Sequence, residues 1–563
     1  MSLRTAVRTF SRARAPVNIV AAPRRALSTA GSSSGGSRSR ARFDWRLAAG
    51  VVGATAVVTY VLSPPMRLEA APKGKGKKAV PSAGIPFSEV QKHNTRDDCW
   101  VIIDGKVYDV TAFIDMHPGG ANIIIANAGK DATKIFKPLH PPDALDILDD
   151  SKKLGPVDPS TLPVVEDEPT DEEKRIAAAR ALLPPADSML LLNDFEEWGE
   201  KVLSSTGWNY YKSAADSEAT MDNNAAAFKR YFFRPRVLRD ITTGDLETEV
   251  CGTKMAMPFF ISPAAMAKLG HPDGEVNLTR GAGNAGIVQG ISINASCSLD
   301  EIMAARQAGQ AVWFQIYLNK DRAASERLLE KVTELGANAI IFTVDVAWQS
   351  KRTRDVRAKA SVAAPIASTG EGKTGSGGKT GKSGKQGAGV SAAISGFQDP
   401  YLLWDDIDFI RKHTNLPIIV KGVQSIEDVA ECAERGVQGV ILSNHGGRAC
   451  DYAPAPIDLL YEMRALRPDL YSKLDVMMDG GVRSGADAVK ALALGAKAVG
   501  LGRPFLYANS THGQEGVERV CEIMEEEITN TMRNCGVTKV ADLKPEMVGP
   551  AGPWVGANRP PWL

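Results

Sequence analysis

The chain of 563 residues has no acidic residue before Asp44, and arginine recurs there among serine and alanine. This composition is typical of a mitochondrial presequence and argues against a folded domain at the start. The next apolar run, residues 47–62, is short: its 16 residues fall below the roughly 20 that span a bilayer comfortably. The run therefore favours a stop-transfer signal, with a single-pass inner-membrane anchor as the alternative.

Paired C-x-x-C cysteines are also absent, and the seven cysteines are scattered, which excludes a zinc framework and a disulfide scaffold. Lys and Arg (67) balance Asp and Glu (66), so a net charge of +1 argues against a general nucleic-acid binder. The length predicts two or three globular units plus tails.

Three segments are expected to lie outside the folded units. Residues 1–80 form a leader and linker that resembles the bipartite signals of the mitochondrial intermembrane space, and membrane contact is expected only through this leader if it is not cleaved. Residues 161–188, acidic and bounded by prolines, are predicted to be a solvated hinge. Residues 368–389 contain Gly, Lys and Ser without core-forming residues, which predicts a disordered loop.

Residues 85–160 are expected to form a small α+β unit. Two apolar strands flank Gly105 as in a hairpin, and His117 follows in the motif HPGG, where a helix ends. His140 lies 23 residues later in KPLHPP, beyond an apolar helical stretch. Two histidines around an apolar wall provide the paired nitrogen ligands that a six-coordinate haem requires.

These motifs together resemble the cytochrome b5 family over about 70 residues. The resemblance implies haem b (protohaem IX) as a cofactor, with His117 and His140 as its axial ligands. Because both axial positions would be filled, the iron is expected to carry electrons and not to bind oxygen.

Residues 189–563 contain eight apolar runs that alternate with segments of helical period. The runs begin near residues 258, 286, 311, 339, 416, 439, 475 and 498. Continuous apolar strands with crossover helices predict a parallel sheet, and eight such units predict a (β/α)8 TIM barrel. The expected fold class is therefore multidomain, with a small α+β haem unit followed by an α/β barrel.

In such a barrel, chemistry is located at the carboxyl ends of the strands. Small, polar and charged residues concentrate at these ends: Ala264, Ala265, Ser292, Gln315, Tyr317, Thr343, Asp345, Lys421, Ser443, His445, Arg448, Asp479, Gly480, Gly481, Arg483, Gly502 and Arg503. The glycines and arginines after the last two strands predict a phosphate site. With Lys421 directed inward to stabilise an anionic reduced ring, they indicate FMN.

His445, Asp345 and Arg448 suggest a reaction. Asp345 can orient His445, and Arg448 can bind a carboxylate through two parallel hydrogen bonds. The set predicts removal of a proton from a group next to a carboxylate while two electrons pass to the flavin.

The stretches SNHGGRACDYAPAP, DGGVRSGADAVKALALGAKAVGLGRPFLY and NYYKSAAD resemble the FMN-dependent 2-hydroxy-acid oxidising family, across essentially all of residues 190–545. The resemblance implies His445 as general base with Asp345 as its partner, and Arg448 and Arg352 as stabilisers of the carboxylate and the intermediate. It implies that Tyr210 binds the carboxylate and meets the haem unit, and that Tyr317 binds the hydroxyl. The implied FMN ligands are Ser292, Gln315, Thr343, Lys421, Asp479, Gly481, Arg483, Gly502 and Arg503.

With the haem unit attached, the resemblance implies oxidation of L-lactate to pyruvate, single-electron transfer through haem to cytochrome c, and a homotetramer. Asn294 stands where lactate-oxidising relatives carry leucine, so glycolate, mandelate or a longer aliphatic 2-hydroxy acid remains an alternative substrate. The stretch VDVAWQSKRTRD also lacks the usual proline and glycine before Arg352. A flavin and haem carrier without turnover is the alternative from another class, but the matched base, partner and carboxylate clamp argue against it.

Overall fold

The computed structural model describes residues 84–115, 117, 121–140, 144–163, 168–363, 395 and 397–563. The predicted leader, residues 1–80, and the predicted loop, residues 368–389, lie outside these ranges. Among the described residues, no helix combines the length and apolar character needed to cross a bilayer.

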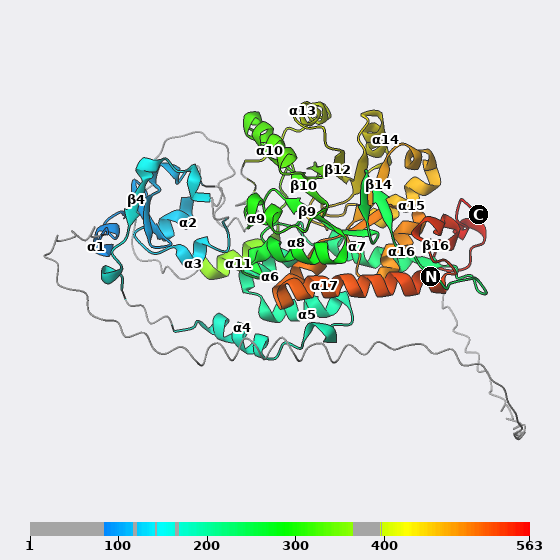
Figure 1. Ribbon diagram of the computed structural model, residues 1–563, viewed down its shortest axis with the longest axis horizontal. Coiled ribbons are helices and arrows are strands. Elements are labelled where there is room, and N and C mark those ends of the chain that lie inside the picture. The colour runs from blue at the N-terminus through cyan, green and yellow to red at the C-terminus, as the bar shows by residue number, and fades with distance from the viewer. Residues whose placement is uncertain are drawn as a thin grey trace, which may run out of the picture. The chain divides into compact units, whose positions relative to one another are not determined.

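The first unit is an antiparallel sheet with short helices (Figure 1). Its strands pair in the order β1 (Asn94–Thr95), β2 (Asp98–Ile103), β3 (Lys106–Asp109) and β4 (Lys153–Pro156). Asp104 and Gly105 both have positive φ, 50° and 70°, so they form the two-residue turn that the hairpin prediction requires. The helices are α1 (Phe87–Val90), α2 (Ala121–Ala126) and α3 (Thr133–Phe136). The predicted α+β architecture is confirmed.

The second unit is a closed barrel of eight parallel strands. They are β8 (Phe259–Ile261), β9 (Val288–Ser292), β10 (Val312–Ile316), β11 (Ala339–Thr343), β12 (Ile418–Val423), β13 (Gly439–Leu442), β14 (Asp475–Asp479) and β15 (Ala498–Leu501). All eight correspond to the apolar runs of the sequence. Nearly every strand residue is buried, because the outer face lies under helices and the inner face fills the barrel.

Helices surround the strands (Figure 1). They are α8 (Gly274–Ala285), α9 (Leu299–Ala304), α10 (Arg322–Glu334), α11 (Thr353–Ala363), α13 (Asp406–His413), α14 (Ile426–Glu434), α15 (Pro456–Leu466), α16 (Gly485–Leu494) and α17 (Arg503–Asn534). A hairpin of β6 (Thr248–Val250) and β7 (Thr253–Met255) contributes to the same apolar cluster as Phe260 and Trp313, and Thr253 Oγ1 accepts a hydrogen bond of 3.1 Å from Trp313 Nε1. A short pair of β5 (Tyr231–Phe233) and β16 (Val548–Pro550) joins distant parts of the chain.

Part of the segment predicted to be a solvated hinge, residues 161–188, is a helix, α4 (Asp171–Ala181). Thr170 and Glu173 form a capping box at its start. The acidic residues in its first turn interact favourably with the positive end of the helix dipole. Arg175 donates to the carbonyl oxygens of Lys201 and Leu203, at 2.6 and 2.7 Å. The acidic composition therefore belongs to a capped, largely exposed helix that is tied to the chain entering the barrel unit.

Three further helices lie between α4 and the barrel strands in the sequence. They are α5 (Leu192–Val202), α6 (Ser205–Lys212) and α7 (Ala219–Ala227). Helix α17 packs against both α5 and α8 (Figure 1). Tyr210 of α6 and Asn224 of α7 line a cavity at the carboxyl ends of the barrel strands, whereas α5 supplies Glu196, which pairs with the cavity residue Arg483.

Candidate active site and haem site

A cavity lies at the carboxyl ends of the barrel strands. Fifteen of the predicted site residues line it: Tyr210, Ala264, Ala265, Ser292, Tyr317, Arg352, Lys421, His445, Arg448, Asp479, Gly480, Gly481, Arg483, Gly502 and Arg503. Gln315, Thr343 and Asp345 do not line it; they belong to the strand ends beside it. The sequence-predicted barrel residues therefore gather at one place, Arg352 included.

The loop after β13 holds His445 in an unusual backbone conformation. His445 has φ +59°, and Gly446 and Gly447 follow with φ of +63° and +83°. The His445 backbone N–H donates to Ser443 Oγ at 3.1 Å. Such a left-handed turn is unfavourable for a residue with a side chain, and it is retained here where the imidazole faces the cavity.

Asp345, which follows β11, is the partner of this imidazole. His445 Nδ1 lies 2.9 Å from Asp345 Oδ1, and the carboxylate is fully buried. A Cβ atom at Gly422 would come within 2.5 Å of Asp345 Cβ, so glycine at this point of β12 makes room for the carboxylate. Because Nδ1 is turned to Asp345, Nε2 is the ring nitrogen left to accept a proton.

Electrostatics keep the pair in the state that a general base needs. Burial lowers the pKa of His445 below its usual value, more than Asp345 raises it, and Lys421 lowers it further. Burial opposes ionisation of Asp345, but His445 and Lys421 outweigh that effect and lower its pKa. At neutral pH the imidazole is therefore neutral and the carboxylate ionised.

Arg448 is held by backbone oxygens on the helix that carries Tyr210. Its Nη2 donates to the carbonyls of Tyr210 and Tyr211 at 2.8 and 2.7 Å, and its Nε donates to Ser213 O at 3.0 Å. Its guanidinium lies 5.6 Å from the centre of the Tyr210 ring. Burial lowers the pKa of Arg448, and the nearby Arg503 and Arg352 add to this effect.

Arg503, predicted to bind the cofactor, has its guanidinium occupied by the protein. Its Nε, Nη1 and Nη2 donate to the carbonyls of Tyr211, Gly446 and Ser213, each at 2.9 Å. In the described part of the chain neither Arg448 nor Arg503 forms an ion pair with a carboxylate. Two partly buried cations without a carboxylate partner make this cavity favourable for an anion.

Arg483, the other predicted phosphate ligand, lines the cavity after β14 and pairs with Glu196 of α5, Nη1 to Oε2 at 2.8 Å. Lys212 also contacts Glu196. Gly502 has open space around a Cβ position, with Ser262 Cβ as the nearest atom at 3.9 Å. The end of the cavity after β14 and β15 thus offers cationic side chains and accessible backbone, as a phosphate requires.

The strand ends beside the cavity carry polar atoms that suit a flavin ring. Gln315 Nε2 and Thr343 Oγ1 are buried without a hydrogen-bond partner in the described structure. Lys421 Nζ, 4 % exposed, lies 3.3 Å from Asp479 Oδ2 and donates to Ser443 Oγ at 3.1 Å. Buried donors without partners cost about 1–3 kcal/mol each, so a heterocycle rich in acceptors fits these residues.

The predicted haem ligands come together in the first unit. The rings of His117 and His140 lie with centroids 6.0 Å apart and planes at 25°. His140 Nδ1 donates to Phe136 O at 3.0 Å, which leaves Nε2 as the ligand atom, and burial lowers the pKa of His140. With metal–nitrogen bonds of about 2 Å, one iron fits between the two rings.

Several cavity residues were missed by sequence reasoning. Asn224 of α7 exchanges hydrogen bonds with Asn444 at 2.8 and 2.7 Å, and Ser262 donates to Asp479 at 3.1 Å. Gln398, which also lines the cavity, precedes α13. The position of Ser262 directly after β8 could have indicated it, whereas Asn224 and Gln398 come from outside the strand ends and carry no such signal.

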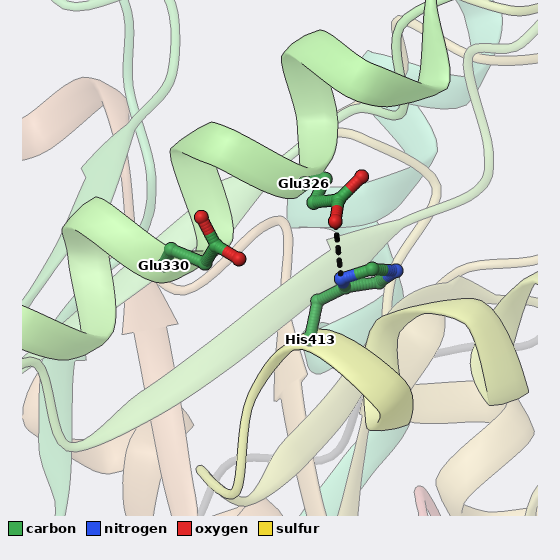
Figure 2. A group of neighbouring side chains, drawn as sticks. All are labelled: Glu326, Glu330 and His413. Atoms are coloured by element: carbon green, nitrogen blue, oxygen red, sulfur yellow. Dashed lines mark ion pairs between the residues drawn. The ribbon is translucent and has the colours of Figure 1, made fainter.

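A second group of ligand-type residues lies between α10 and α13 (Figure 2). Glu326 and Glu330 are one turn apart on α10, and His413 Nδ1 lies 3.4 Å from Glu326 Oε1. All three side chains are at least partly exposed. This arrangement is explained by a surface ion pair that joins two helices.

A base with a buried partner, an anion-seeking cavity with flavin-type donors, and a bis-histidine unit define a flavin and haem oxidoreductase. Residues 199–550 match the FMN-dependent dehydrogenase family, and residues 86–158 match the cytochrome b5-like heme/steroid binding domain. The chain belongs to the FMN-dependent dehydrogenase family and carries a cytochrome b5-like domain ahead of it. FMN and haem as cofactors, predicted from the sequence, are confirmed.

Two fungal relatives align with 82% of this chain, and a solved structure aligns with 68% of it. L-lactate dehydrogenase (cytochrome) of Wickerhamomyces anomalus is 44% identical over 462 residues, covering 82% of this chain and 78% of the relative. The protein of the same name from Saccharomyces cerevisiae is 43% identical over 477 residues, covering 82% and 79%. The crystal structure of the flavin-binding domain of baker's yeast flavocytochrome b2 is 41% identical, with a TM-score of 0.61, over 68% of this chain and 92% of that chain. The predicted TIM barrel is thereby confirmed.

Proposed function

We propose that this enzyme oxidises a short L-2-hydroxy acid, with L-lactate as the leading substrate and pyruvate as the product, and that cytochrome c is the final electron acceptor. The observation that carries the proposal is the His445–Asp345 pair, which faces the same cavity as the unpaired cation Arg448. The names of the fungal relatives support lactate and a cytochrome.

Residues of this chain can bind the substrate carboxylate, donate a hydrogen bond to the substrate oxygen and accept a proton. Arg448, Arg352 and Tyr210 line the cavity where they can hold the substrate carboxylate. Burial raises the pKa of the Tyr317 phenol, so it stays protonated and can donate a hydrogen bond to the substrate oxygen. The reaction removes two protons and two electrons from the substrate: His445 Nε2 takes one proton, from the hydroxyl or the adjacent carbon, and Asp345 stabilises the imidazolium that results. FMN, when bound at the carboxyl ends of the strands, would supply a two-electron acceptor, and haem held by His117 and His140 would supply single-electron transfer.

We also propose the mitochondrial intermembrane space as the location and a homotetramer as the assembly. The arginine-rich leader and its short apolar run support the location. Apolar side chains on residues 232–241, including Val237 and Leu238 at 80 % and 102 % exposure, support contact with another copy. Fractionation of the source cells and light scattering of the purified protein test these two proposals.

The deciding experiment mixes the holoenzyme anaerobically with L-lactate and follows the flavin and haem absorbance together. We expect the flavin to bleach first and the reduced haem band to rise after it. Flavin bleaching by another L-2-hydroxy acid but not by lactate would change the substrate and keep the reaction. Failure of every such acid to reduce the flavin would overturn the proposal.

A second candidate, oxidation of a different 2-hydroxy acid, is favoured by one observation. Asn294 lines the cavity and places an amide there.

A further inference from the structure

Two side-chain amides, those of Asn294 and Gln398, line the cavity without a hydrogen bond to the protein. No such bond to either side chain is found in the described part of the chain, although Asn294 N donates to Ser292 Oγ at 3.2 Å. Gln398 is 7 % exposed and Asn294 is half-buried, so both side chains are partly shielded from bulk water. The other buried cavity amide, Asn224, is paired with Asn444. The two unpaired amides therefore offer a donor and an acceptor each to whatever fills the cavity.

Both amides flank the end of β10, where Tyr317 stands. On one side, Asn294 follows β9, and Ile293 N donates to Gln315 O at 3.1 Å. On the other side, Gln398 pairs with Asn319, and the Lys320 and Asp399 N–H groups donate to Phe397 O and Leu318 O at 3.1 and 2.9 Å. Tyr317, the proposed partner of the substrate hydroxyl, thus has an amide from each neighbouring segment.

The proposed function already assigns cavity residues to the carboxylate and the hydroxyl carbon of the substrate. Arg448, Arg352 and Tyr210 suit its carboxylate, and His445 and Tyr317 suit its hydroxyl carbon. The remaining contacts near Tyr317 fall to the substrate side chain. A wholly apolar side chain there would give neither amide a hydrogen-bond partner, and an amide that the substrate then shields from water loses about 1–3 kcal/mol.

We propose that Asn294 and Gln398 form a polar side-chain subsite, so that the enzyme accepts L-2-hydroxy acids with a hydroxyl group on C3 and prefers them to apolar acids of the same size. This inference rests on the proposed function and extends its substrate class. L-Glycerate is the simplest acid of this kind, because it differs from L-lactate by one hydroxyl group.

The test compares L-glycerate with L-2-hydroxybutanoate, in which a methyl group replaces the side-chain hydroxyl at nearly the same volume. We expect kcat/KM for flavin reduction to favour L-glycerate by about 10-fold, the value of one good neutral hydrogen bond. In Asn294→Leu and in Gln398→Leu this ratio should fall toward 1. Gln349→Leu removes an exposed amide of the cavity rim and should leave the ratio unchanged.

Binding provides a readout that does not depend on turnover. Hydroxypyruvate and 2-oxobutanoate differ in the same way as the two substrates, and their dissociation constants follow from the change that they cause in flavin absorbance. We expect the preference for hydroxypyruvate to disappear in Asn294→Leu, while the flavin content and reduction by L-lactate persist and show that the variant is folded.

The outcomes separate the two proposals. Flavin reduction with the same substrate ratio in the parent enzyme and both leucine variants would overturn the polar subsite alone. A preference for L-2-hydroxybutanoate in the parent enzyme would do the same. Lack of flavin reduction by every acid would overturn the proposed function and this inference with it.

Discussion

Replacing Asp345 by asparagine isolates the charge behind the catalytic base. The substitution keeps the size of the side chain and an oxygen that can accept from His445 Nδ1, now 2.9 Å from Asp345 Oδ1. It removes a buried negative charge that no solvent can replace, because the carboxylate is fully buried. Gly422 leaves the space for this side chain, so the amide fits without displacing β12.

The expected effect follows from the imidazolium that forms during turnover. A hydrogen bond to a charged group contributes about 1.5–3 kcal/mol, so its loss should lower kcat roughly 10-fold to 150-fold. Asp345 raises the pKa of His445, so its removal lowers that pKa further. The base must be neutral to act, and the acid limb of the pH profile should therefore move to lower pH in Asp345→Asn.

Anaerobic stopped-flow reduction of the flavin between pH 4.5 and 8 measures both effects. The dissociation constant of pyruvate serves as control, because Arg448 and Tyr210, which we propose hold the carboxylate, line the cavity and remain untouched. Unchanged reduction at neutral pH, or an acid limb that moves to higher pH, would refute the role given to Asp345. A large loss in pyruvate binding would show that the variant disturbs the whole cavity.

Three further variants test other parts of the enzyme. Arg448→Lys cannot reproduce the bonds to the carbonyls of Tyr210, Tyr211 and Ser213, so kcat/KM should fall roughly 100-fold, with weaker pyruvate binding; equal affinity would contradict the clamp. His140→Ala should abolish the haem band and cytochrome c reduction while flavin reduction persists; retained haem would exclude His140 as a ligand. Gly422→Ala, at φ +105° and against Asp345, should lower the stability by about 1–3 kcal/mol in denaturant titration and the activity as Asp345→Asn does.

The architecture could be predicted from the sequence because its signals are local. Each barrel strand is a mostly apolar run. Lys421 lies within β12, and Ser443 directly follows β13. The capping box at Thr170 was equally local, but the acidic residues after it suggested a hinge and masked the start of α4.

The contacts of the site could not be predicted in this way. Arg503 carries the signature of a phosphate ligand, but its guanidinium is held by carbonyls of Tyr211 and Ser213, almost 300 residues earlier in the chain, and by Gly446. Asn224 reaches the cavity from a helix outside the barrel. Pairings of this separation depend on tertiary packing and leave no periodic signal.

The cationic cavity and the neutral base depend on each other. Lys421 and Arg352 lower the pKa of His445, after burial itself, and so keep it neutral before substrate binds. A bound carboxylate offsets these positive charges, and its own negative charge favours the imidazolium, so the pKa of His445 rises when substrate is in place. Arg352, which we propose contacts the substrate, and Lys421 therefore keep the base unprotonated in the empty enzyme, and its affinity for a proton is expected to increase when substrate binds.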